Sequence, residues 1–164
     1  MTASNIDDFY YVSAELLSSL YAAFPVPHLL LVEDITGPIS WDITGLPDRR
    51  SLACFETMIW LSQQGLLSYR SLEPRNVGVE GAALTQQGFV LLASSLRWDD
   101  GADSTRIDAV RDAQARLAYD DLGRIINDLI YANCQWGAPL AAQPVRRSAA
   151  LTIVEAEDEP VIRA

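Results

Sequence analysis

Two stretches near the middle of the chain decide the fold that we expect: FETMIWLSQQGLL at residues 55–67 and LTQQGFVLL at residues 84–92. In the first stretch, apolar residues recur at the spacing of one helical face. Gly65 stands where a glycine commonly ends a helix, and Asp48 is a suitable N-cap upstream. The pattern therefore predicts an amphipathic helix over residues 48–64.

The segment between the two stretches is typical of a β-hairpin. Apolar and polar side chains alternate over residues 66–70, as in a strand. Residues 82–84 form a second strand-like run after a segment rich in proline, asparagine and glycine. Thr85 is a favoured N-cap residue for a further helix that runs through Leu92. The order expected is helix, glycine turn, strand, hairpin tip, strand, helix.

An N-terminal helix is predicted over residues 13–24, where apolar side chains repeat at helical spacing behind a capping Ser13. Pro25 and Pro27 end it, because proline cannot donate to the helical hydrogen-bond ladder and restrains the residue before it.

The segment that follows is less regular. Residues 28–37 are mostly apolar and fit either a short helix or a buried strand, and so short a run does not decide between them. Residues 37–47 are rich in turn-forming glycine and proline, and we expect Trp41 to fill the core beneath this connection.

The C-terminal part predicts one long amphipathic helix over residues 105–131, with Thr105 and Asp108 at the spacing of a capping box. An acidic spacer precedes this helix, and the sequence beyond Pro139 is typical of a flexible tail. We therefore expect three parts: a compact domain over residues 1–96, the spacer and long helix over 97–137, and a tail over 138–164.

The quoted stretches resemble winged-helix bacterial proteins, namely regulators of the MarR and PadR kinds, over residues 48–95. The resemblance implies a mainly α fold: a winged-helix-like domain, with a three-helix core and a β-hairpin wing, followed by the long C-terminal helix. In that family the helix matching residues 48–64 enters the major groove of DNA and the hairpin tip touches the backbone. Carried over by position, the nucleic-acid-binding candidates are Arg49, Arg50, Thr57, Arg70 and Arg75.

The overall charge argues against a simple DNA-binding role. All 12 basic residues are arginine, against 22 acidic residues, and the formal net charge of −10 repels polyanions. Residues 48–75 are by contrast slightly basic. The sequence thus predicts a protein that acts through protein contact, as an adaptor, antitoxin-like or immunity-like factor; the alternative is a dimeric DNA-binding transcriptional regulator.

A homodimer is the second kind of partnership that we expect. The helix predicted over residues 105–131 carries apolar residues on more than one face, which favours a subunit interface. The interface candidates on this helix are Leu117, Leu122, Ile126 and Ile130.

No catalytic, cofactor or metal motif is visible in the sequence. His28 is the sole histidine, and neither a nucleophile elbow nor a phosphate-cradling glycine loop occurs. Cys54 and Cys134 stand far apart without zinc-site spacing; we expect Cys54 to be a buried thiol and Cys134 to be exposed. An enzyme is therefore not expected, and neither is a bound cofactor.

The sequence also indicates a cytoplasmic protein. Residues 1–9 are polar and acidic, unlike the start of a signal peptide. A typical apolar run, at residues 29–32, is far shorter than the roughly 18 residues of a membrane span.

Overall fold

The computed structural model describes residues 5–75, 77–97 and 103–136. These residues form six helices and six short strands. The helices are α1 (Asn5–Ala23), α2 (Val32–Thr36), α3 (Arg49–Gln63), α4 (Gln86–Ala93), α5 (Arg106–Ala115) and α6 (Tyr119–Cys134). The strands are β1 (His28–Leu31), β2 (Leu67–Ser68), β3 (Ser71–Leu72), β4 (Gly78–Leu84), β5 (Ser95–Arg97) and β6 (Asp103–Thr105). The described part is thus mainly helical with a small antiparallel sheet.

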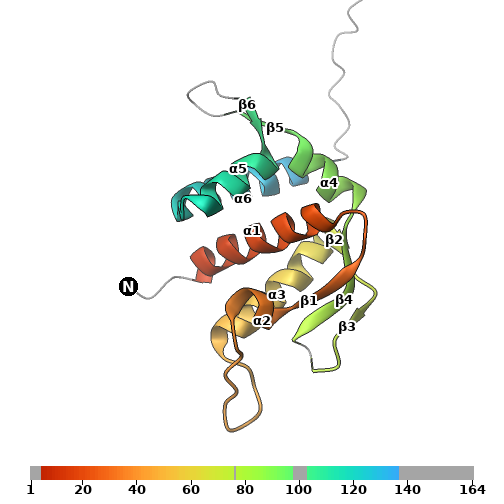
Figure 1. The fold of residues 1–164 in the computed structure, drawn as a ribbon, viewed down its shortest axis with the longest axis vertical. Helices are drawn as coiled ribbons and strands as arrows, with labels where there is room; N and C mark the ends of the chain where they lie inside the picture. Colours follow the sequence, from red (N-terminus) through yellow and green to blue (C-terminus); the bar gives the residue numbers. More distant parts are fainter. Residues whose placement is uncertain (1–4, 76, 98–102, 137–164) are drawn as a thin grey trace, which may run out of the picture.

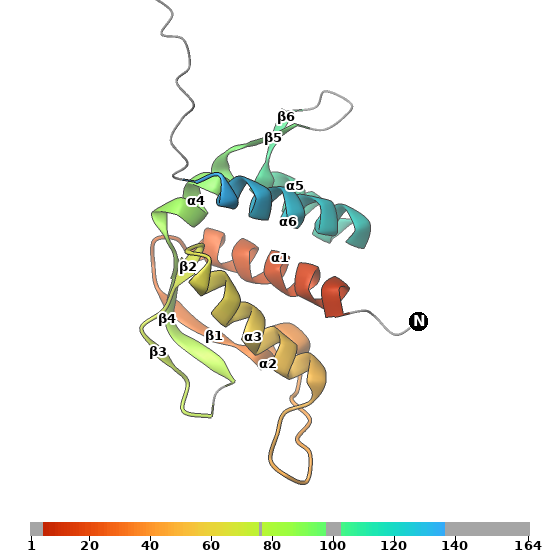
Figure 2. The ribbon, with the colours of Figure 1, turned by 180° about the vertical axis from the view of Figure 1, so that it is seen from behind.

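Helix α1 lies at the centre of the molecule (Figure 1). It packs against α3 on one side and against α5 and α6 on the other. Seen from behind, α6 and α3 flank α1 on opposite sides (Figure 2). One continuous set of buried side chains includes Leu16 and Leu20 of α1, Met58 of α3 and Ile125 of α6. The segments 1–96 and 97–137 therefore share this core.

The sheet is built around β4. Strand β1 pairs with one edge of β4, with Leu30 opposite Val79, and β2 and β3 pair with the other, with Leu67 opposite Leu84. All of these pairings are antiparallel, which confirms the hairpin predicted between residues 66 and 84.

The threonine and glycine of the LTQQG stretch have clear physical roles at the junction of sheet and helix. The Thr85 hydroxyl accepts a hydrogen bond from the Gly88 amide at 3.0 Å and donates one to the Gly65 carbonyl at 2.5 Å. Gly65 has a φ of +73°, as expected of a glycine after a helix. A Cβ atom on Gly88 would lie 2.0 Å from the Leu66 carbonyl oxygen, so only glycine fits. These contacts confirm the predicted helix end and the Thr85 cap.

The N-terminal half corrects two sequence expectations, the start of the first helix and the place of Trp41, and decides the open one at residues 28–36. Helix α1 includes residues from Asn5 onward, so Ser13 is a buried residue within the helix and not its cap. The apolar stripe reaches back through Val12 to Phe9, which explains the longer helix. Residues 28–36 are a strand and then a helix, β1 followed by α2. Trp41 is an exposed side chain and fills no core.

The prediction of one long helix over residues 105–131 is wrong, because the chain folds back on itself there. Helices α5 and α6 meet at a turn in which Leu117 has a φ of +54°. The turn lets two apolar faces pack into the core, Ile107 and Val110 from α5 and Ile125 from α6. A single straight helix could bury one such face only. The Thr105 cap is confirmed, since its hydroxyl accepts a hydrogen bond from the Asp108 amide.

In the residues that the structure describes, no helix has the length and apolarity needed to cross a membrane. The tail expected over 138–164 and most of the acidic spacer lie outside the described residues.

Candidate functional site

The connection between α2 and α3, residues 37–48, is an ordered hairpin loop. The Asp42 amide donates to the Leu46 carbonyl, and Trp41 and Pro47 form an isolated antiparallel bridge. The Asp42 carboxylate accepts hydrogen bonds from the Thr44 amide at 2.8 Å, the Thr44 hydroxyl at 2.7 Å and the Leu46 amide at 2.9 Å. These hydrogen bonds, that of the Thr44 hydroxyl foremost, lower the pKa of Asp42. One carboxylate therefore organises the turn.

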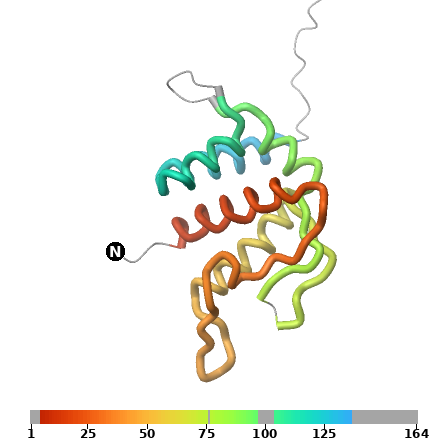
Figure 3. Tube along the Cα trace, in the orientation of Figure 1, coloured from red at the N-terminus to blue at the C-terminus, as the bar shows by residue number. Residues whose placement is uncertain are grey.

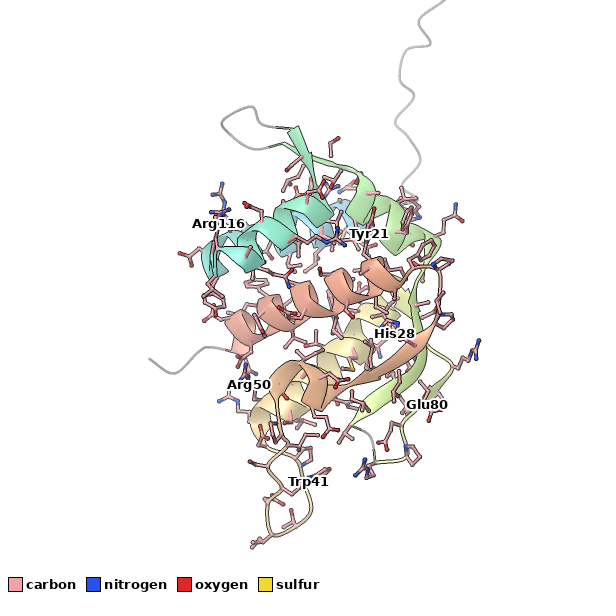
Figure 4. All side chains as sticks on the ribbon, viewed as in Figure 1. Tyr21, His28, Trp41, Arg50, Glu80 and Arg116 are labelled. Carbon is pink, nitrogen blue, oxygen red and sulfur yellow. The ribbon has the colours of Figure 1, made fainter. Side chains whose placement is uncertain are left out.

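The end of this hairpin is apolar and exposed. Trp41 and Leu46 have 48% and 62% of their surface exposed, and Ile43 is fully exposed. We call these three residues the apolar tip. Figures 1 and 3 show that the loop projects away from the packed helices and sheet. Trp41 lies on this projection, at a distance from the labelled residues of the rest of the fold (Figure 4).

The base of the hairpin is fixed to the start of α3. Asp48 donates its amide to the Ser40 carbonyl at 2.8 Å and accepts the Ser40 amide on its carboxylate at 3.1 Å. The same carboxylate caps α3 by accepting the amides of Ser51 and Arg50, as predicted, and these hydrogen bonds lower the pKa of Asp48. The hairpin is therefore held in a defined position beside the first turn of α3.

The four arginines expected to bind nucleic acid do not form one basic surface. Arg49 donates two hydrogen bonds to Asn5 Oδ1, at 2.8 and 3.1 Å, and Arg75 forms an ion pair with Glu73 at 3.3 Å. Arg50 and Arg70 are exposed at different places, Arg50 on α3 and Arg70 between β2 and β3. We call Arg49, Arg50, Arg70 and Arg75 the arginine set.

Thr57 does not belong with these arginines at the surface. Its side chain is only 5% exposed, and its hydroxyl donates to the Ala53 carbonyl at 2.7 Å. Thr57 lies on the face of α3 that carries the buried Cys54 and Met58, so no DNA could reach it in this fold.

Two of the four expected interface residues lie inside the molecule. Leu122 and Ile126 are buried in the core that α6 forms with α1 and α5, and they are therefore not available to a second copy of the chain. Leu117 is exposed at the turn between α5 and α6, and Ile130 is half-buried. The sequence pattern indicated an apolar helix face correctly but did not show that this face packs inside the same chain.

The two cysteines and the histidine belong to three different elements, α3, α6 and β1. Cys54 is buried and Cys134 is exposed, both as expected, and neither is in a disulfide. Burial raises the pKa of the Cys54 thiol to about 12, which keeps it protonated and unreactive at neutral pH. His28 begins β1, and its Nδ1 atom is buried without a hydrogen-bond partner. Within the described ranges, no three His, Cys, Asp or Glu side chains gather as a metal site would require.

Asp42, Ile43 and Leu46 were not predicted from the sequence as functional residues. The sequence does contain a short turn motif here, Asp42 followed two residues later by Thr44. An Asp side chain commonly closes a turn by accepting a hydrogen bond from the backbone two residues on. Comparisons with protein-family models, with curated proteins and with solved structures gave no match.

Proposed function

We propose that this chain is a small acidic winged-helix protein of the cytoplasm that acts through contact with another protein, without catalysis, and that the apolar tip is its contact surface. The observation that carries the proposal is the ordered hairpin whose three large apolar side chains face solvent. Exposed apolar side chains gathered on one projection are typical of a protein-binding surface.

The arrangement of elements supports the winged-helix part of the proposal. Helices α1, α2 and α3 pack together, and β2 and β3 pair with β4 as a hairpin after α3. This is the order of a three-helix core and a wing that the resemblance to MarR and PadR regulators implies. Helices α5 and α6 then cover the other side of α1.

The hairpin is suited to binding because it is already ordered. Its turn is closed by Asp42 and its base by Asp48, so a partner would not have to order the loop, and little conformational entropy would be lost on binding. The tip is convex and narrow, which calls for a concave apolar pocket on the partner. With a net charge of −10 on this chain, a basic rim around that pocket would favour the encounter.

The alternative role, a dimeric DNA-binding regulator, has less support from the geometry. Arg49 and Arg75 are engaged with Asn5 and Glu73, and Thr57 is buried. The hairpin also adjoins the first turn of α3, the end of a recognition helix that normally approaches the base edges. An apolar projection at that point would hinder entry into the major groove.

A pull-down from cells that naturally produce the chain tests the proposal. The tip variant replaces Trp41, Ile43 and Leu46 with serine, and the matched control replaces Arg49 and Arg50 with alanine. Both sets of side chains are exposed or half-exposed, so the thermal stability of both variants should stay near that of the parent. We expect the tip variant to lose a partner protein that the parent and the arginine variant both retain. Loss in the arginine variant alone, with DNA in the parent's complex, would contradict the proposal.

A further inference from the structure

A second surface, separate from the apolar tip, lies between the first turns of α1 and the outer face of α3. It is an open groove of about 480 Å³. Its walls are mainly apolar, and Glu56 and Gln63 add polar groups along α3; the apolar walls come from Ile6, Phe9, Ala53 and Trp60. None of the hairpin residues 37–48 lines it.

An aromatic pair forms part of the groove wall. The rings of Phe9 and Trp60 meet edge to face, with centroids 5.3 Å apart and an interplanar angle of 85°. Grooves walled by aromatic rings are a common binding surface for extended proline-containing segments, since such segments lose little conformational entropy when they dock. Glu56 is exposed beside this pair, so the groove also offers a negative charge to a basic group.

The described chain ends close to one end of this groove. Asn133 on α6 donates a hydrogen bond to the Gln64 carbonyl at 3.1 Å, directly after Gln63, which lines the groove. Trp136 follows within about one helical turn of Asn133. The chain then continues for 28 residues to Ala164, and it leaves the described fold near the C-terminal end of α3.

The composition of the next segment matches the groove. Residues 137–150 contain Pro139 and Pro144, several small apolar residues and, as their only charges, Arg146 and Arg147. An extended segment over residues 139–147 spans about 25 Å at the rise of a polyproline helix. The distance along α3 from Gln63 to Glu56 is about 10 Å. The segment is therefore long enough to reach Glu56 with its arginines.

We propose that residues 139–147 of this chain occupy the groove between α1 and α3, with the proline-containing part against Phe9 and Trp60 and with Arg146 and Arg147 near Glu56. The inference does not depend on the function proposed for the apolar tip, because the two surfaces share no residue.

Trypsin cleavage of the full-length chain tests the charge contact, since Arg146 and Arg147 are cleavage sites that docking would protect. Glu56→Arg reverses the charge of the groove, and Asp34→Arg makes the same change on exposed α2 as a matched control. We expect release of the fragment after residue 147 to be about two- to fivefold faster in E56R than in the parent, the range of one surface charge contact, and unchanged in D34R. Equal rates in all three chains would overturn the proposal.

Disulfide trapping tests the position of the segment without relying on charge. In a chain with Cys134→Ser, the pair Gln63→Cys and Leu140→Cys should form an intramolecular disulfide at least tenfold faster than the control pair Asp34→Cys and Leu140→Cys. Equal rates for the two pairs would contradict docking in the groove. Disulfide-linked dimers from the first pair would place the segment on a second copy, which would also overturn the proposal.

Discussion

The apolar tip and the arginine set belong to the same fold, the tip on one hairpin and the arginines on α3 and around β3. The two sets of side chains differ in how far contacts within the chain already occupy them. The arginines are charged and suited to DNA, but Arg49 and Arg75 are already engaged with polar groups of their own chain. The tip residues are apolar, and Ile43 is fully exposed. The comparison shows that the type of a side chain indicates its function only together with the contacts it already makes.

Both sets of residues are carried by the folded chain, and breaking the junction between the sheet and α4 should have the largest effect on its stability. In Gly88→Ala, the new Cβ would lie 2.0 Å from the Leu66 carbonyl oxygen, so either α4 or the β2 region must move. We expect a loss of about 3 kcal/mol in the free energy of unfolding, measured by chemical denaturation. A loss below about 1 kcal/mol would show that the packing around Gly88 is looser than the structure describes.

A second prediction separates structural arginines from those of the arginine set. The Arg106 side chain is 11% exposed, binds Asp128 at 2.7 Å and donates to the Ser94 hydroxyl and the Leu91 carbonyl. Arg106→Ala should therefore lower the free energy of unfolding by about 2 kcal/mol. Arg49→Ala, which loses only exposed bonds to Asn5, should lower it by about 0.5 kcal/mol. Equal losses in denaturation experiments would remove the distinction.

A third prediction concerns the backbone of the hairpin. Gly45 has a φ of +80° and open space where a Cβ would stand. Gly45→Ala should thus lower the free energy of unfolding by about 1 kcal/mol, because the strain comes from the left-handed backbone alone. The measurement is again chemical denaturation, beside the Gly88→Ala variant. A loss in the free energy of unfolding as large as that of Gly88→Ala would mean that residues 37–48 pack more tightly than the structure indicates.

The smallest effect that we predict is a local loss of order in the hairpin at low pH. Hydrogen bonds from Thr44 and Leu46 hold the pKa of Asp42 below its ordinary value of 3.8. The ionised carboxylate therefore orders the turn fully above pH 3.8, and this contribution is lost as the pH falls through the lowered pKa. Hydrogen exchange at the Thr44 and Leu46 amides, corrected for its intrinsic pH dependence, should show this loss.

The matched control is Asp42→Asn, whose amide does not titrate in this range. Its corrected protection should be independent of pH. A pH dependence equal to that of the parent would show that another group controls the turn.

The sequence predicted the parts of the fold that rest on local chemistry. Asp48, Gly65 and Thr85 were all identified as helix boundaries, because capping and left-handed glycine are set by neighbouring residues. The turn between α5 and α6 was not predicted, since it contains neither glycine nor proline and Leu117 takes a positive φ in it. What favours that turn is the burial of both helices against α1, which depends on residues distant in the sequence.

The candidate site was predicted less well for the same reason. Thr57 was assigned to the surface because its own helix does not show which of its faces α1 and the sheet will cover. Trp41 was assigned to the core because a tryptophan in a turn-rich segment is more often buried than exposed. In the structure the Asp42 hydrogen bonds close the turn at the end of the loop, and Trp41 is exposed.

The most direct test of the account is site-specific photo-cross-linking in cells that naturally produce the chain, with the cross-linking residue at position 43 and, for comparison, at position 75. We predict a defined adduct with another protein from position 43, abolished when Trp41 and Leu46 are replaced by serine and retained when Arg49 and Arg50 are replaced by alanine. A nuclease-sensitive adduct from position 75, with none from position 43, would contradict the account.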